Sequence, residues 1–183
     1  MEEYRNYDYC IKAVKRNGLN LRYVRKQDDK LCKAAVQQNG SALKHVKNKT
    51  PEIVRAAVKN NGKALRFVPE QTPELCKLAV KNNGYAIKYV REQTEDLCMA
   101  AVKEDPFALQ YVRNQTEKVC LAAVKQDGLA LMYVRNQSKK ICKAAIESNY
   151  RALRFVGNPT DDIIEFALSC DPRTETLVQQ LQS

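Results

Sequence analysis

A phrase of 14 residues occurs three times in this chain at a fixed spacing. Residues 89–102 read YVREQTEDLCMAAV, residues 111–124 read YVRNQTEKVCLAAV and residues 133–146 read YVRNQSKKICKAAI, so the period is 22 residues. Rows of 22 extend the pattern to eight repeats, at 6–27, 28–49, 50–71, 72–93, 94–115, 116–137, 138–159 and 160–181. Such a period is typical of proteins in which one supersecondary motif stacks on copies of itself.

Every repeat opens with a residue that commonly caps a helix. The opening residues are Asn6, Asp28, Thr50, Thr72, Thr94, Thr116, Ser138 and Thr160. Their side chains can accept a hydrogen bond from a backbone N–H of the first helical turn. Apolar residues follow at helical spacing, as in Leu75, Cys76, Ala79 and Val80. We therefore expect each repeat to begin with an α-helix of about three turns.

A glycine closes this first helix in most repeats. It is found at Gly18, Gly40, Gly62, Gly84 and Gly128. Because glycine often ends helices in the left-handed conformation, we expect a tight glycine turn there. A second helix of about two turns should follow, with Ala86, Ile87, Tyr89 and Val90 on its apolar side in the fourth repeat.

The pattern predicts an all-α protein, an α-solenoid of eight 22-residue helix-turn-helix repeats that forms one domain over residues 1–183. The last repeat, 160–181, is expected to be a capping unit, because Asp171 and Pro172 replace the glycine turn and Glu175 takes an apolar position. Residues 1–5 align poorly with a preceding second helix, so we expect the first repeat to be uncapped or to be met by a partner there. Leucine-rich repeats are the alternative at this length, but their asparagine and leucine alternation is missing, whereas helix caps recur in every repeat.

One motif resembles that of a known family. Ala-Val-Lys-Asn-Asn-Gly-x-Ala-Leu-x-Tyr-Val, present at 79–90 with Ile87 in place of leucine, is similar to a family of short helical repeats. That family is known only as a domain of unknown function and is abundant in giant viruses of amoebae. The resemblance extends from residue 6 to about residue 159. It implies a helical array and a viral source, and it supplies no activity and no site residues.

The sequence contains no candidate membrane span. Its longest apolar runs, among them Val119–Val124 and Leu129–Val134, have six residues each, whereas a transmembrane helix needs about 18 or more. The N-terminal residues MEEYRNYDYC lack the basic-then-apolar form of a secretory signal. We therefore expect an intracellular protein, in the cytoplasm, and in the host cytoplasm if the source is viral.

Six of the seven cysteines occupy one position of the repeat. They are Cys10, Cys32, Cys76, Cys98, Cys120 and Cys142, and Val54 and Ile164 fill the same position elsewhere. A position shared by Cys, Val and Ile is a small apolar core position. Stacked helices lie about 8–10 Å apart, too far for disulfides between neighbouring repeats. Cys170 lies outside this set and is the thiol whose reactivity we would test.

Neither a metal site nor a catalytic site is indicated. Cys-x-x-Cys is absent and His45 is the only histidine, so zinc has no recognisable ligand set. His45 takes the position of Tyr23, Phe67 and Tyr89 in other repeats, so we expect it to substitute for a core aromatic residue. Nucleophile–base pairs, phosphate loops and distinctive carboxylate pairs are also missing. The sequence therefore predicts no enzyme and no cofactor.

Four positions outside the apolar face are rich in Lys and Arg, and the net charge is +10. The candidate basic columns consist of Arg22, Arg25, Lys33, Lys44, Lys47, Arg55, Lys59, Arg66, Lys77, Lys81, Lys88 and Arg91. Stacked repeats would align such residues along a phosphate backbone, although basic columns are also tolerable without a partner. The tyrosines next to them are expected in the core, because phenylalanine fills the same position.

In the fifth and sixth repeats two of these basic positions turn neutral: Met99 and Leu121 fill one, and Gln110 and Met132 fill the other. Exposed apolar patches mark interfaces, although curvature of the stack could bury these side chains. We therefore interpret the chain as a non-catalytic repeat scaffold that binds a macromolecular partner. The sequence favours a protein on the apolar patch, and RNA or DNA on the basic columns is the alternative. It indicates no small-molecule substrate and leaves the oligomeric state open.

Overall fold

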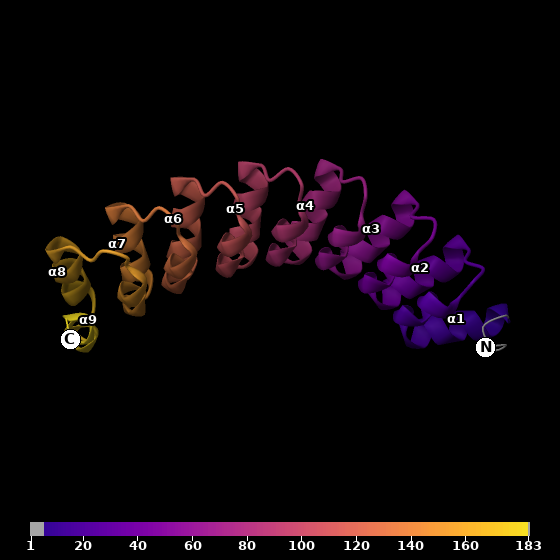
Figure 1. Cartoon of the computed structure of the whole chain (residues 1–183), viewed down its shortest axis with the longest axis horizontal. Helices are drawn as coiled ribbons and strands as arrows, with labels where there is room; N and C mark the ends of the chain where they lie inside the picture. The colour runs from indigo at the N-terminus through magenta and orange to yellow at the C-terminus, as the bar shows by residue number, and fades with distance from the viewer. Residues whose placement is uncertain (1–5, 183) are drawn as a thin grey trace. The chain divides into compact units, whose positions relative to one another are not determined.

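The computed structural model describes residues 6–182 and shows an α-solenoid, in which every regular element of this range is a helix (Figure 1). The prediction about residues 1–5 lies outside the described residues. Tertiary contacts divide the chain into two compact units, Met1–Glu92 and Gln93–Ser183, which are described one at a time. The expectation of one continuous domain stays a prediction.

The first unit contains α1 (Tyr7–Arg16), η2 (Gly18–Tyr23), α2 (Asp29–Gln38), η3 (Gly40–His45), α3 (Pro51–Asn60), η4 (Gly62–Phe67), α4 (Pro73–Asn82) and η5 (Gly84–Tyr89). The second contains α5 (Glu95–Glu104), η6 (Pro106–Tyr111), α6 (Glu117–Gln126), η7 (Gly128–Tyr133), α7 (Lys139–Ser148), η8 (Tyr150–Phe155), α8 (Asp161–Cys170) and α9 (Thr174–Gln182). Elements named η are 3₁₀ helices. In each unit, α-helices pack on α-helices and 3₁₀ helices on 3₁₀ helices, which makes two layers with contacts between them.

The helix starts confirm the predicted caps. All eight opening residues are N-caps with extended backbone. Asp28 accepts from the Leu31 N–H at 2.8 Å, and Thr72 accepts from the Leu75 N–H at 3.2 Å. The side chains of Thr50 and Thr160 are exceptions and make no cap hydrogen bond. The Thr50 Oγ1 is buried and has no hydrogen-bond partner. Pro51 lies in the first turn of that helix, where a missing N–H costs nothing.

The predicted left-handed glycine turn is wrong. No glycine within residues 6–182 has a positive φ. The α-helices end at the preceding Asn or Asp, whose extended backbone redirects the chain, and the glycine begins the next helix. Glycine is needed for another reason: a Cβ on Gly40 would lie 2.5 Å from the carbonyl oxygen of Ala57 in the next repeat. Gly18 and Gly62 are still more tightly covered, so glycine lets the backbones of neighbouring repeats touch.

The second helix of the first seven repeats has the predicted two turns but is a 3₁₀ helix of six residues. An Asn or Asp side chain starts each one, as when Asn39 Oδ1 accepts from the Ser41 N–H at 2.9 Å. This local bond turns the chain within two residues and leads into i to i+3 bonding. Only the last repeat, the predicted cap, has a second α-helix, α9.

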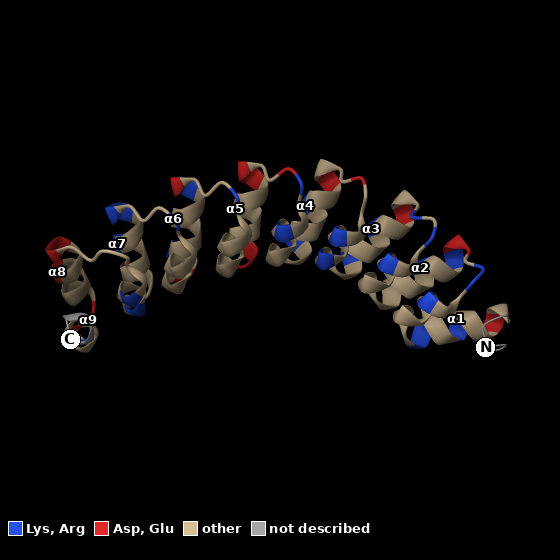
Figure 2. Cartoon of the chain, in the orientation of Figure 1, with Lys and Arg blue, Asp and Glu red and all other residues tan. Residues whose placement is uncertain are grey.

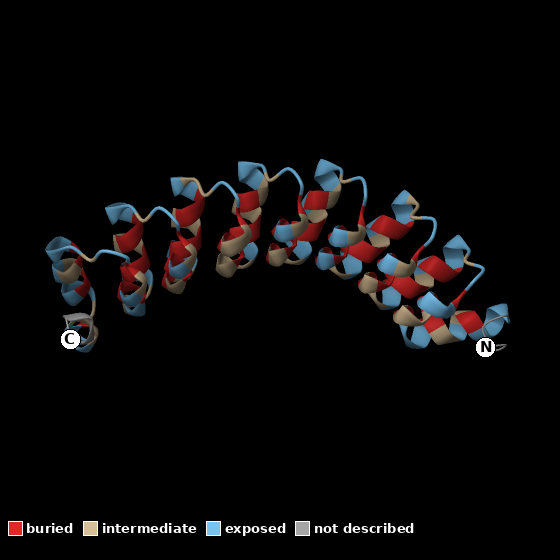
Figure 3. Ribbon diagram, in the orientation of Figure 1, coloured by how far each residue is buried: buried red, intermediate tan, exposed pale blue. Residues whose placement is uncertain are grey.

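The core of each unit lies between its two layers, where the buried positions recur in every repeat (Figure 3). The six matched cysteines are buried, as predicted, and all seven thiols are free.

The aromatic column was predicted in the core, and this prediction is wrong for Tyr23, which is 47% exposed. His45 and Phe67 are half-buried. Because a 3₁₀ helix has three residues per turn, Leu43 and Val46 share its inner face, and the residue between them lies at the rim.

Candidate binding surfaces

Glutamine side chains join successive repeats and hold equivalent residues in register. Gln27 Nε2 donates to the His45 carbonyl oxygen at 3.0 Å, while its Oε1 accepts from the Lys47 N–H at 3.0 Å. Gln71, Gln93, Gln115 and Gln137 make the same pair of bonds to their next repeats at 2.9–3.1 Å. We name these five residues the glutamine clamps. The role of these glutamines was not predicted, although their recurrence directly before the helix caps is visible in the sequence.

A second set of amides holds the α-helix ends of the first unit. Asn60 Oδ1 accepts from the Gly40 N–H at 2.6 Å, and its Nδ2 donates to the Gln37 carbonyl oxygen at 2.8 Å. Gln38 and Asn82 make equivalent bonds to their preceding repeats. Since these bonds satisfy backbone groups that helix ends leave open, they hold neighbouring repeats together at the C-terminal ends of the α-helices.

The columns of the first unit lie on two outer sides. Because the two layers share one core, their exposed residues face away from each other. We name the exposed surface of α1–α4 the α side and that of η2–η5 the 3₁₀ side. Figure 2 shows Lys and Arg recurring along this unit. All twelve candidate basic residues are exposed and belong to it.

Five of the candidates lie on the α side, namely Lys33, Arg55, Lys59, Lys77 and Lys81. Acidic residues accompany them on the same helices, because Asp29, Glu52 and Glu74 occupy the first turns of α2, α3 and α4. These carboxylates suit the helix dipole. The α side therefore carries mixed charge, with basic columns next to an acidic edge.

Four candidates lie on the 3₁₀ side, namely Arg22, Lys44, Arg66 and Lys88. The sequences of η2–η5, GLNLRY, GSALKH, GKALRF and GYAIKY, contain no Asp or Glu. The guanidinium groups of Arg22 and Arg66 lie 4.4 Å from the centres of the Tyr23 and Phe67 rings. Burial lowers the pKa of the His45 imidazole, and the charges of Lys44 and of Arg22 from the preceding repeat lower it further. The 3₁₀ side is therefore a surface of positive potential.

The remaining candidates, Arg25, Lys47 and Arg91, lie on the connections between repeats. Lys47 Nζ donates to the Arg25 carbonyl oxygen at 2.7 Å, just after the C-terminus of η2. In the second unit the Arg135 guanidinium likewise donates to the Arg113 and Val112 carbonyl oxygens at 2.8 and 3.1 Å. A cation at this position therefore satisfies the carbonyl groups that follow a helix end.

The predicted apolar patch in the second unit does not form one surface. Met99 and Leu121 are half-buried on α5 and α6, on the outer side of the α layer. Leu121 also lines a shallow hollow with Ala122 and Lys125. Met132 is 48% exposed on η7, in the other layer. Of the three residues, Met132 alone is a large exposed apolar side chain.

Ion pairs between repeats partly neutralise the α layer of the second unit. Lys118 Nζ lies 3.0 Å from a Glu95 carboxylate oxygen, and Lys140 Nζ lies 3.1 Å from one of Glu117. The hydrogen bond from Lys118 lowers the pKa of Glu95 and raises that of the lysine itself. Lys139 and Lys143 similarly share the Asp162 carboxylate, at 2.8 and 3.0 Å.

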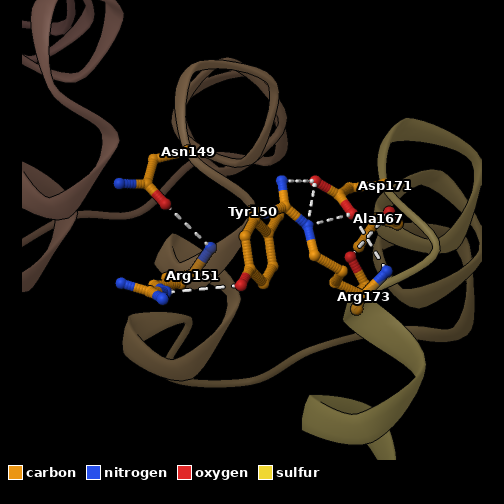
Figure 4. A network of polar contacts seen from close by, with 7 residues as sticks. Asn149, Tyr150, Arg151, Ala167, Asp171 and Arg173 are labelled. Carbon is orange, nitrogen blue, oxygen red and sulfur yellow. Dashed lines mark hydrogen bonds and ion pairs between the residues drawn. The ribbon is translucent and has the colours of Figure 1, made fainter.

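A polar cluster near the C-terminus completes the second unit (Figure 4). Tyr150 stands where glycine begins the 3₁₀ helix elsewhere, and the Arg173 guanidinium lies 4.6 Å from its ring centre. The Asp171 carboxylate accepts from Arg173 at 2.6 Å, and the Thr174 hydroxyl donates to the Ala167 carbonyl oxygen at 3.1 Å. We therefore interpret this cluster as part of the cap formed by the last repeat.

Within the described residues, the side chains that could bind a metal are dispersed, and the thiols of the six matched cysteines are buried. Among residues 6–182, no group of three or more His, Cys, Asp or Glu side chains is placed to hold a metal ion. Burial raises the pKa of the Cys32 thiol to about 11, and the carboxylates of Asp28 and Asp29 add to this effect. Burial also raises the thiol pKa of the other five matched cysteines.

In the described part of the chain, no helix has both the length and the apolar composition needed to cross a membrane.

Comparison with known proteins identified one family. The model of a domain of unknown function (DUF4116) matches residues 6–50, 72–117 and 94–137, which together are more than half of the chain. Searches of curated proteins and of solved structures gave no match.

Proposed function

Since the chain belongs to the DUF4116 family, whose model matches repeatedly along it, we propose that it is a non-catalytic repeat scaffold that binds an acidic macromolecular partner. The observation that carries this proposal is the distribution of charge over the first unit. Residues 6–92 contain 19 Lys and Arg against seven Asp and Glu, a net charge of +12. All twelve candidate basic residues are exposed there. Gln27 bonds the first repeat to the second and Gln71 bonds the third to the fourth, while Asn60 bonds the third repeat to the second.

The physical basis is the fixed spacing of the columns. Backbone contacts at the glycines and hydrogen bonds from the clamps hold neighbouring repeats together. A partner with regularly spaced negative charges can therefore meet one cation per repeat without reorganising the scaffold. Electrostatic attraction of this kind raises association rates and weakens with added salt.

Binding of three labelled polyanions to the whole chain tests the proposal. The probes are polyglutamate, a DNA duplex and a single-stranded oligonucleotide, and fluorescence anisotropy at low salt measures binding. At least one probe should bind, with an affinity that falls as salt is added. If none binds at low salt, the chain does not act on an acidic partner.

Met132 supports a protein partner as the second candidate. It is 48% exposed on η7, at the position that carries Arg22, Lys44, Arg66 and Lys88 in the first unit. A partner bound there should be lost from pulldowns with Met132→Glu. Met99→Glu, in the other layer, is the matched control and should retain it. Equal retention by both variants would remove this candidate.

The proposed setting is the interior of a cell, in the host cytoplasm if the source is viral, as the sequence resemblance implies. Six matched cysteines held as buried free thiols support this setting, because structural cysteines of extracellular proteins are usually oxidised to disulfides.

A further inference from the structure

Each 3₁₀ helix of the first unit ends in a basic residue followed directly by a ring. The pairs are Arg22–Tyr23, Lys44–His45, Arg66–Phe67 and Lys88–Tyr89. The four basic side chains are exposed, the Tyr23 ring is 47% exposed, and the other three rings are half-buried. The 3₁₀ side thus presents one cation and one ring in every repeat.

The pairs lie in adjacent positions along the layer. Consecutive 3₁₀ helices from η2 to η5 pack on one another, and two glutamine clamps bond directly to the carbonyl oxygens of His45 and Tyr89. Packed helices lie about 8–10 Å apart. Arg22 lowers the pKa of His45 across the boundary between repeats, as expected for neighbouring positions.

Cations and rings form one combined surface rather than two separate features. The Arg22 and Arg66 guanidinium groups lie over the neighbouring rings at 4.4 Å, and Lys63 Nζ lies 5.6 Å from the centre of the Tyr85 ring. A guanidinium plane can itself stack on a base while its N–H groups reach a phosphate. Because η2–η5 contain no carboxylate side chain, none of their own groups would repel a phosphate there.

We propose that the 3₁₀ side of the first unit binds single-stranded nucleic acid. This inference rests on the proposed function and names the class of its acidic partner. Proteins that bind single strands combine cations along the backbone with rings on which the bases stack. A duplex encloses the faces of its bases and could use only the cations. An acidic polypeptide could also use the cations, but it has no array of bases to stack on the rings.

The first experiment compares three probes on the full chain by fluorescence anisotropy. They are a mixed-sequence single strand of about 15 nucleotides, within the size range that such proteins cover, a duplex of the same length, and polyglutamate of similar charge. We expect the single strand to bind most tightly, with an affinity that falls as salt rises. Equal or tighter binding of the duplex or of polyglutamate would overturn the inference and leave the proposed function standing. Absence of binding by all three at low salt would overturn both.

The second experiment assigns the surface with variants of matched charge. Arg22→Gln with Arg66→Gln removes two cations from the 3₁₀ side, whereas Arg55→Gln with Lys77→Gln removes two from the α side. The first variant should make the slope of log affinity against log salt shallower by about 1.4, at about 0.7 per phosphate contact. The second should leave the slope close to that of the parent chain. An equal decrease of this slope in both variants would show that binding depends on overall charge, and it would overturn the assignment to the 3₁₀ side.

The third experiment tests stacking. Tyr23→Leu keeps an apolar side chain but removes an exposed ring, and we expect affinity for the single strand to fall about 5- to 150-fold. Tyr9→Leu is the control, because Tyr9 is 42% exposed but lies on α1, away from the 3₁₀ side. Circular dichroism checks that both variants are folded. An unchanged affinity for Tyr23→Leu would show that the rings do not stack on bases.

Discussion

The side-chain amide of Gln71 donates a hydrogen bond to the carbonyl oxygen of Tyr89, 18 residues further along the chain, at 2.9 Å. The same side chain accepts from the Arg91 N–H at 3.1 Å. Gln71→Met keeps much of the volume but leaves both backbone groups without this partner, so we expect a loss of about 1–3 kcal/mol in the free energy of unfolding. Gln37→Met, at an exposed position on α2, should change it by less than about 0.5 kcal/mol. Urea denaturation measures both, and equal effects would contradict the clamp.

Lys49 occupies a clamp position, and Pro69 occupies the position whose N–H would bond to it. Lys49→Gln alone can regain only the bond to the Phe67 carbonyl oxygen, because proline has no N–H. Lys49→Gln with Pro69→Arg can form both bonds. We expect a favourable coupling of about 0.5–1.5 kcal/mol between the two changes. A double-mutant cycle by urea denaturation measures this coupling. Additive effects of the two single changes would show that residues 49 and 69 do not depend on each other for the clamp bonds.

Gly40 and Gly157 differ in how much space a Cβ atom would have at each position. A Cβ on Gly40 would lie 2.5 Å from the Ala57 carbonyl oxygen, whereas the nearest such atom to a Cβ on Gly157 is Gln137 Oε1 at 3.9 Å. Gly40→Ala must therefore push two repeats apart, and we expect a loss of about 1–3 kcal/mol of stability. Gly157→Ala should stay within about 0.5 kcal/mol of the parent. Thermal unfolding compares the two, and a neutral Gly40→Ala would show that the repeats can separate at little cost.

The helices and the buried cysteine column could be predicted because each depends on residues that recur within one repeat. Caps such as Asp28 and apolar spacing such as Cys76 with Val80 act locally, so the period of 22 was sufficient. The role of Gly40 could not be predicted, because it depends on an oxygen of Ala57 in the next repeat. Propensity also does not distinguish a two-turn α-helix from a 3₁₀ helix of six residues.

The candidate surfaces were predictable only in part. Exposure of the twelve basic residues followed from their positions outside the apolar face. Their division between two sides did not, since it requires knowing that the core lies between two layers. The exposure of Tyr23 was missed because a ring next to Val24 was expected to share its burial, whereas only Val24 lies on the inner face of the 3₁₀ turn.

The seven thiols should divide into two reactivity classes. Cys170 is exposed, while the six matched cysteines are buried and burial raises their pKa. Because the thiolate is the reactive form, iodoacetamide at neutral pH should label Cys170 alone in the folded chain and all seven cysteines in denaturant. Mass spectrometry of the labelled chain counts the groups. Rapid labelling of a second cysteine without denaturant would show that the core opens locally.

His45 reports directly on the 3₁₀ side, because it is the only histidine of the chain. Its pKa is lowered first by burial and then by the positive charges of Lys44 on its own helix and Arg22 on η2. Bound phosphates would offset those charges and favour the imidazolium, so a saturating single strand should raise this pKa. By linkage, binding should then tighten as the pH falls from about 7 to 5, the range in which histidine titrates. Proton NMR of the imidazole measures the midpoint with and without the oligonucleotide, and His45→Gln should remove the part of the pH dependence that comes from this residue. A midpoint that does not move at saturation would place the ligand elsewhere.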